Sequence, residues 1–235
     1  GPYSRAVSIT NNNVYEYLGI NMNRIIWQID DYIIDMFNTD SKRLHEYVYP
    51  LNINGSMENI SLAMTPESDK QKSYGNVPGT MHIRNLSNSD KTAVGWSSVC
   101  NIGDSGKTKM KINMLGGDNT VVTTGFGIED SNEDIYNKLV LLAKRKKKST
   151  CFVNIMDPGK NDSFRTVLQL ASPENNGQKT YAAEIRSNDG IKDTILCSAH
   201  TYDRSVNGYK TDAQSAFFRN VNEVDTIIGC INGTK

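Results

Sequence analysis

The sequence has no long apolar run: nothing in its 235 residues approaches the roughly 20 consecutive apolar residues of a membrane-spanning helix. Its start shows no signal-peptide pattern. It also has no excess of charge, because 26 lysines and arginines balance 26 aspartates and glutamates. Domains that bind nucleic acid are usually basic. We therefore expect partners other than nucleic acid or a membrane.

Cysteine and histidine are scarce, with four and three residues. The cysteines are far apart and form no C-x-x-C pair, which disfavours zinc-ribbon and thioredoxin-like sites. Each lies in or beside an apolar run, which predicts buried free thiols: Cys100, Cys151, Cys197 and Cys230. Two disulfides are the alternative if the protein is exported. His82 and His200 lack metal-ligand spacing, so we expect no metal and no cofactor.

A convincing helix is also missing, since the best candidate, 131–148, has only a short apolar run rich in β-forming residues. Instead, apolar segments at intervals of about ten residues, bounded by Gly, Asn, Asp, Pro or Lys, extend from 93 to 231. This spacing predicts an all-β fold, an antiparallel β-sandwich in a single domain. We assign 24–235 to the domain and 1–23 to a lead-in segment, where Gly1-Pro2 looks like the remnant of a removed purification tag.

The most informative stretch is 24–51. Alternation of apolar and polar residues predicts a first strand from Arg24, Asp30-Asp31 predicts a hairpin turn, and 32–37 predicts a second strand. The polar segment 38–43 predicts another turn before a third strand. If Asp35 is buried, we expect it to pair with Arg24, because an unpaired buried carboxylate is costly.

On that third strand His45, Tyr47 and Tyr49 share one face, because alternate residues of a strand point the same way. A histidine beside two tyrosines is what a sugar-binding wall needs. The alternative is a half-buried strand whose rings belong to the core, and whose histidine is structural.

Two basic groups also stand out. Lys107, Lys109 and Lys111 alternate along one predicted strand face, and 144–148 form a second group at a predicted hairpin tip. Clustered positive charge attracts acidic ligands, so we predict that the three alternating lysines contact an acidic polysaccharide. The alternative for both groups is a solvated charged surface.

The chain resembles the C-terminal β-sandwich of heparinase II/III-like polysaccharide lyases. In that family a basic residue opens a strand ending in Val-Asp, followed by a YxxDxF strand and a His-x-Tyr segment. The matching positions here are Arg24, Ile29-Asp30, Tyr32, Asp35, Phe37, His45 and Tyr47. The later run from KMKINMLGG to TCFVNIM is similar to the family's Gly-Gly turn, basic hairpin and Thr-x-Phe-Val strand. The family often carries a second histidine a few residues after the first, and in this chain Pro50 stands near that place.

The resemblance implies a supersandwich-like fold and a secreted or periplasmic enzyme. It implies a parent that cleaves an acidic, uronate-containing glycan, of the glycosaminoglycan kind, by β-elimination. Most catalytic residues would lie upstream in a helical toroid, which would be the partner of this domain. His45 is the catalytic candidate here, Tyr47 and Tyr49 are substrate-binding candidates, and the fragment alone would be inactive. The alternative is a non-catalytic carbohydrate-binding or structural β-sandwich.

Overall fold

The computed structural model describes residues 4–11, 19–76, 79–103, 108–117, 119–130, 135–159, 163–171, 174–175 and 178–233. All regular structure within these ranges is β-strand, and the strand pairs are antiparallel wherever a register is defined. The predicted all-β antiparallel fold is confirmed. Within the same ranges, no helix has the length and apolar character needed to cross a membrane.

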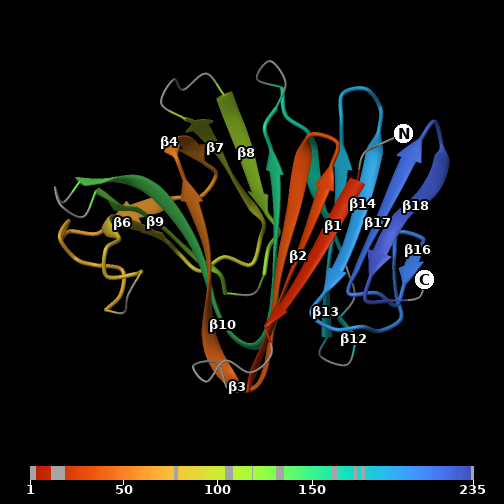
Figure 1. Ribbon diagram of the computed structural model, residues 1–235, viewed down its shortest axis with the longest axis horizontal. Coiled ribbons are helices and arrows are strands. Elements are labelled where there is room, and N and C mark those ends of the chain that lie inside the picture. Colours follow the sequence, from red (N-terminus) through yellow and green to blue (C-terminus); the bar gives the residue numbers. More distant parts are fainter. Residues whose placement is uncertain are drawn as a thin grey trace. The chain divides into compact units, whose positions relative to one another are not determined.

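The strands of the first half of the chain are β1 (Ser4–Asn11), β2 (Ile20–Ile29), β3 (Tyr32–Ile53), β4 (Gly55–Ile60), β5 (Met64–Pro66), β6 (Arg84–Ser89), β7 (Trp96–Ile102), β8 (Thr108–Met114) and β9 (Val121–Asp130). Those of the second half are β10 (Ile135–Asp157), β11 (Thr166–Leu170), β12 (Glu174–Asn175), β13 (Gln178–Arg186), β14 (Lys192–Ser198), β15 (Arg204–Val206), β16 (Tyr209–Thr211), β17 (Ser215–Val221) and β18 (Val224–Ile231). Figure 1 labels most of them.

The chain divides into two compact units. The first contains 1–45, 113–115 and 147–235, and the second contains 46–112 and 116–146. Strands β3, β8 and β10 each contribute residues to both units, because the unit boundaries fall within them. The two units are described separately below.

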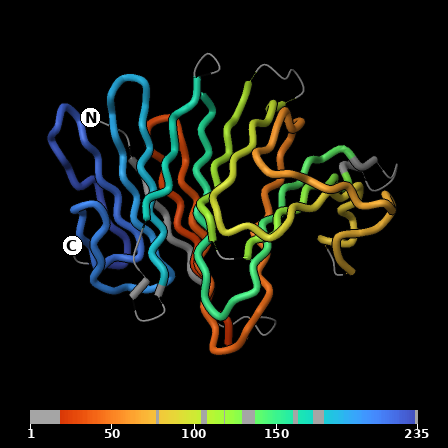
Figure 2. The backbone as a smooth tube through the Cα atoms, turned by 180° about the vertical axis from the view of Figure 1, so that it is seen from behind, coloured from red at the N-terminus to blue at the C-terminus, as the bar shows by residue number. Residues whose placement is uncertain are grey.

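The first unit is a β-sandwich. One of its sheets contains β1, β2 and the first part of β3, and the other has the order β11-β13-β14-β17-β18. The strands of this second sheet lie side by side in Figures 1 and 2, coloured from cyan to dark blue. Buried side chains from both sheets form one apolar core, whose members include Ile25, Trp27, Ile29, Ile34, Met36, Tyr181, Ile185, Ile195 and Phe217.

Trp27 ties the two sheets of this sandwich together. Its ring stacks on Phe217 with the ring centroids 5.9 Å apart, and its Nε1 donates a 2.8 Å hydrogen bond to Ser215 Oγ. A buried tryptophan needs such an acceptor for its N–H while its ring supplies a large apolar surface. The period-two pattern that predicted this strand therefore also identifies its core-facing side.

The predicted Asp30-Asp31 hairpin is confirmed, since Ile29 pairs with Tyr32 and Asp30 has φ of 48°. The predicted turn at 38–43 is wrong. Strand β3 continues through this segment, and its pairing with β2 extends from Tyr32 to Ser41. Polar residues form no turn here because Asn38 and Thr39 are buried within the ladder. A polar segment predicts a turn only when its side chains are free to face water.

The predicted pair of Arg24 and Asp35 is also confirmed. Arg24 Nε donates to Asp35 Oδ1 over 2.9 Å, and a second guanidinium nitrogen bonds the other carboxylate oxygen. Asp35 is only 1% exposed. Two charge-assisted hydrogen bonds offset part of the desolvation of the buried carboxylate.

A second ionic cluster surrounds the hairpin turn. Arg219 donates to both oxygens of Asp193, over 2.7 and 2.8 Å, and also contacts Asp30 at 2.9 Å. Tyr32 donates its hydroxyl hydrogen to Asp193 over 2.6 Å. Hydrogen bonding to Asp193 raises the pKa of the Arg219 guanidinium, and burial raises that of the Tyr32 phenol.

The second unit contains β4 to β7, β9 and parts of β3, β8 and β10. Its small core joins Ile83, Leu86, Val140 and Leu142. The basic segment 144–148 is not a hairpin tip as predicted, because β10 continues through it. Arg145 is 1% exposed, its Nε donates to Thr120 Oγ1 over 2.8 Å, and its guanidinium packs on Gly117. Because Gly117 has no Cβ, there is room beside it for the guanidinium of Arg145. The charge pattern of the surrounding sequence does not indicate that this arginine is buried.

All four cysteines are free thiols, as predicted. Three are buried as expected, but Cys230 is exposed. It lies on the edge strand β18, most of whose side chains are exposed. An apolar neighbourhood in the sequence therefore does not ensure burial on an edge strand.

Candidate functional site

A polar pocket of about 370 Å³ lies in the first unit, where the core-facing rows of β2 and β3 change from apolar to polar. Along β2 the buried side chains of Ile29, Trp27 and Ile25 are followed at the same spacing by Asn23 and Asn21. Because alternate residues of a strand share a face, these five side chains all lie on the core-facing side of β2. The first three are apolar and the last two are polar.

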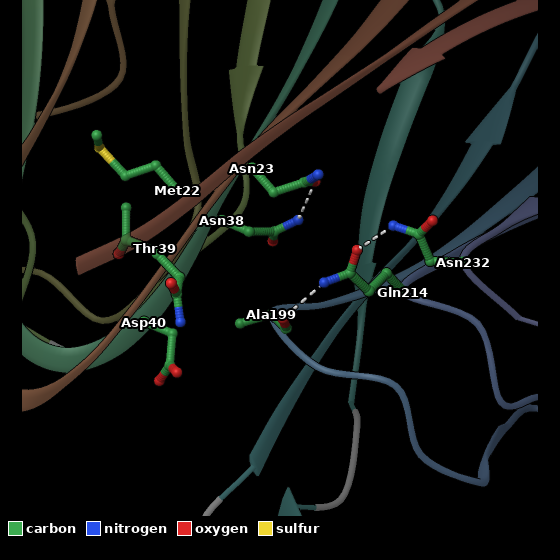
Figure 3. Close-up of a pocket in the computed structure, with 9 residues that line it drawn as sticks. Met22, Asn23, Asn38, Thr39, Asp40, Ala199, Gln214 and Asn232 are labelled. Carbon is green, nitrogen blue, oxygen red and sulfur yellow. Dashed lines mark hydrogen bonds between the residues drawn. The ribbon is translucent and has the colours of Figure 1, made fainter. Parts of the chain in front are cut away.

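Strand β3 shows the same change. Its core-facing residues Ile34 and Met36 are followed by Asn38 and Asp40. The register pairs Asn23 with Asn38 and Asn21 with Asp40, so the four polar side chains come together on two neighbouring strands. The strand ends of the second sheet complete the lining, which we call the amide pocket: Asn21, Met22, Asn23, Asn38, Thr39, Asp40, Ala199, Gln214 and Asn232 (Figure 3).

Most amide groups in the pocket are hydrogen-bonded to one another. Gln214 Nε2 donates to Ala199 O over 2.8 Å, and Asn232 Nδ2 donates to Gln214 Oε1 over 2.6 Å. Across the pocket, Asn38 Nδ2 lies 3.5 Å from the Asn23 Oδ1 that accepts its hydrogen. Dashed lines in Figure 3 mark these three bonds. Side-chain amides held in this way present fixed donors and acceptors to a ligand.

One polar atom of the pocket stands out. Asn38 is 3% exposed, and its Oδ1 has no hydrogen-bond partner. A buried oxygen without a donor costs about 1–3 kcal/mol, so each such atom requires an explanation. Its place in the lining of a polar pocket identifies Asn38 as a ligand-contact candidate.

A second pocket, of about 620 Å³, adjoins the first and shares Asn21 and Asp40 with it. Its remaining residues, which we call the basic rim, are Gly19, Ser41, Lys42, Arg43 and His45. Lys42 and Arg43 are exposed and His45 is half-buried. The two pockets together join a neutral polar lining to a strip of cations, with Asp40 at their junction.

His200 approaches this junction but does not form a catalytic triad. Its Nε2 lies 3.2 Å from Ser149 Oγ and 3.5 Å from Asp40 Oδ1. A serine nucleophile needs one imidazole nitrogen as its base while a carboxylate orients the other nitrogen. Here both groups approach the same nitrogen, so the arrangement does not activate Ser149.

The predicted site residues have separate locations. His45 lies in the basic rim. Tyr47 and Tyr49 are only 6% and 2% exposed, which fits the alternative interpretation that their rings belong to the core. A sugar stacks on an exposed ring face, so neither tyrosine can offer one in this structure. Both rings therefore have no part in the proposed contacts.

Two of the three predicted lysines, Lys109 and Lys111, line neither of the pockets described above. Lys109 and Lys111 belong to the second unit, where Lys109 pairs with Glu58 at 3.0 Å. Lys107 lies outside the described residues. Among the described residues, no group of histidine, cysteine, aspartate and glutamate side chains has the arrangement of a metal site.

The amide pocket was not predicted from the sequence. Its signal was present, because Asn21, Asn23, Asn38 and Asp40 continue the period-two rows of core residues. Asparagines at core-facing positions are unusual and indicate either a buried network or a binding site. The segment 38–43 was interpreted as a turn instead. No protein-family model and no curated protein sequence matches the chain.

Proposed function

We propose that this chain binds an acidic, uronate-containing glycan along the amide pocket and the basic rim. We further propose that it forms one wall of the substrate cleft in a polysaccharide lyase that acts by β-elimination. The observation that carries the binding proposal is the buried, unpartnered Oδ1 of Asn38 in a polar pocket that adjoins a cationic strip.

The chemistry of the two pockets suits a sugar acid. Sugar hydroxyls both donate and accept hydrogen bonds, and a lining of asparagine and glutamine offers both partners. The carboxylate of a uronate needs cations or N–H donors, which Lys42 and Arg43 supply at the rim. These exposed cations also attract an anionic chain from solution, an effect that salt weakens.

The lyase part of the proposal rests on the resemblance given above. β-Elimination needs a base for the C5 proton, an acid for the leaving oxygen and a group that neutralises the carboxylate. His45 at the rim is the candidate for a proton-transfer role, because an imidazole can both accept and donate a proton. The remaining groups would come from an upstream helical domain, in a protein with a secreted or periplasmic location. We therefore expect no lyase activity from this chain alone.

Calorimetric titration with acidic and neutral oligosaccharides of equal length tests the binding proposal. We expect the acidic oligosaccharides to bind more tightly, with an affinity that falls as salt rises. Replacing both rim cations, Lys42→Ala with Arg43→Ala, should weaken binding about tenfold, because two charge-assisted contacts are lost.

The control removes equal charge elsewhere. Lys138 and Lys146 are exposed lysines of the second unit, and their double alanine variant should bind as the wild type does. Equal weakening by both double variants, or no preference for acidic oligosaccharides, would contradict the proposal.

A second candidate function is a non-catalytic carbohydrate-binding module. It is favoured by the fact that every residue lining the two pockets belongs to one compact unit of this chain. An assay for unsaturated product, made with a natural chain that carries this segment and any upstream domain, separates the two functions. Product formation supports the lyase, whereas glycan binding without product supports the module.

A further inference from the structure

Arg204, the first residue of β15, is a buried arginine that forms no ion pair with any residue that the structure describes. Its guanidinium donates instead to three backbone carbonyls. Nη1 bonds Tyr202 O over 3.3 Å, while Nη2 bonds Gln214 O over 3.2 Å and also Ala213 O. A guanidinium carries five N–H hydrogens, so these three bonds leave at least two of them without an acceptor. One of these is the buried Nε–H.

Arg219, which is also buried in the first unit, shows the usual arrangement. Two hydrogen bonds join it to the Asp193 carboxylate, and they raise the pKa of its guanidinium. Burial instead lowers the pKa of the Arg204 guanidinium, although Asp212 lies near enough to favour its charged form. A buried cation without a counterion is costly, so Arg204 requires an explanation.

A pocket of about 400 Å³ lies at this arginine, and we call it the hairpin pocket: its lining is Asp203, Arg204, Ser205, Lys210 and Thr211. Strands β15 and β16 supply most of this lining, because their register pairs Arg204 with Thr211 and Ser205 with Lys210. Val206 and Tyr209 fix the hairpin by packing into an apolar cluster of the second sheet. Two cations, Arg204 and Lys210, face one carboxylate, so the lining has an excess of positive charge.

We propose that the hairpin pocket binds a carboxylate group of a ligand. An ionised carboxylate only accepts hydrogen bonds, so it provides acceptors for the unpaired N–H groups of Arg204. Lys210 and Ser205, both exposed, add a second cation and a hydroxyl donor. Because Asp203 and the nearby Asp212 offset much of the positive charge, the pocket suits one negative charge better than the two of a phosphate dianion.

This site is independent of the proposed glycan site, because no residue of the hairpin pocket lines the amide pocket or the basic rim. Its ligand is either a small free acid or a sugar acid, since both present the same carboxylate. The experiment below separates these two sources.

The test follows the Nε–H signal of Arg204 by proton–nitrogen correlation NMR during titration with acetate or with glucuronate. Chloride keeps the ionic strength constant, and triple-resonance spectra assign the signal, so the buried arginine needs no substitution. We expect the signal to move saturably with a dissociation constant on the order of 1–10 mM, because few charge-assisted contacts form at an open pocket.

Two lysine variants provide the matched comparison. Lys210→Ala should weaken binding about threefold, because it removes one exposed cation from the pocket. Lys138→Ala, at an exposed lysine of the second unit, should bind as the wild type does. The double variant Lys42→Ala with Arg43→Ala should leave the Arg204 response unchanged, since both residues belong to the basic rim.

The relative affinity of the two probes identifies the source of the carboxylate. Equal affinity would support recognition of the acidic group alone, and tighter binding of glucuronate would support a sugar acid. The absence of a saturable shift with either probe, or equal weakening by Lys210→Ala and Lys138→Ala, would overturn the proposal. Neither result depends on whether acidic oligosaccharides bind at the amide pocket.

Discussion

Asn38 faces Asn23 across strands β2 and β3, with Asn38 Nδ2 3.5 Å from Asn23 Oδ1, while the Oδ1 of Asn38 itself has no partner. The next core-facing residue of β3, towards its start, is Met36, which is fully buried in the apolar core. A leucine at 38 would extend that core and avoid the cost of an unpaired oxygen. A buried polar atom that lowers stability and lines a pocket is best explained by binding.

The ion pair of Arg24 with Asp35 should contribute measurably to stability. Arg24→Met leaves the buried Asp35 carboxylate without the guanidinium, so we expect the free energy of unfolding to fall by about 1–3 kcal/mol. Urea denaturation measures the change. Lys72→Met, which removes an exposed partner of Glu67, should cost less than about 1 kcal/mol. Similar losses of stability in the two variants would show that the buried pair contributes no more than the exposed one.

Removing the hydroxyl group should affect the free energy of unfolding differently at two tyrosines. Tyr32→Phe removes the bond to Asp193 within the buried ionic cluster, and should lower the free energy of unfolding by about 1.5–3 kcal/mol. The Tyr74 hydroxyl is buried without a partner, so Tyr74→Phe should leave stability unchanged or raise it slightly. Denaturation of both variants at neutral pH decides the matter, and a larger loss at Tyr74 would contradict the structure.

Tyr74 also predicts a pH dependence. Burial, reinforced by the nearby Glu46 carboxylate, raises the pKa of Tyr74 to about 12, against about 10 in an unfolded chain. Its neutral phenol therefore adds stability that is fully present below pH ~10 and is lost as the pH rises through ~12. Tyr74→Phe lacks this loss, so its free energy of unfolding should rise relative to that of the wild type between pH ~8 and ~11. A stability difference that stays constant over this range would refute the shift.

The all-β fold and the 24–37 hairpin could be predicted because period-two alternation reports directly on a half-buried strand. The Arg24–Asp35 pair could be predicted because a buried carboxylate needs a cation and the hairpin brings Arg24 near. The amide pocket was missed although the period-two rows continue into it, because the run 38–43 has the composition of a turn. What keeps it in a strand is pairing with β2 and packing in the sandwich, both of which are non-local.

The buried position of Arg145 was missed for a related reason. Its neighbours in the sequence are exposed or half-buried lysines, and only the distant Gly117 and Thr120 create room and an acceptor for it. A Cβ added at Gly117 would lie 2.2 Å from Arg145 Cζ. We therefore expect Gly117→Ala to lower the free energy of unfolding by about 1–3 kcal/mol. Gly127→Ala, whose Cβ would meet Val140 at 3.3 Å, should cost less when both are compared by urea denaturation.

The cysteines give a simple chemical test of the structure. Cys230 is exposed, whereas burial raises the pKa of the Cys197 and Cys100 thiols and limits reagent access to them. A thiol-specific chromogenic reagent should modify one cysteine rapidly in the native protein. All four cysteines of the chain should react after unfolding. Rapid reaction of more than one native thiol, or retained reactivity in Cys230→Ser, would contradict the assigned burial.

The measurement that tests the central claim most directly compares Asn38→Leu with Asn113→Leu, for stability by urea denaturation and for affinity towards an acidic oligosaccharide by calorimetry. Both asparagines are buried and each has one unpaired side-chain atom, but Asn113 does not line either pocket. We predict that both substitutions keep or raise the free energy of unfolding, and that only Asn38→Leu lowers affinity, by about tenfold. Unchanged affinity in a folded Asn38→Leu variant would contradict the claim that this pocket binds the glycan.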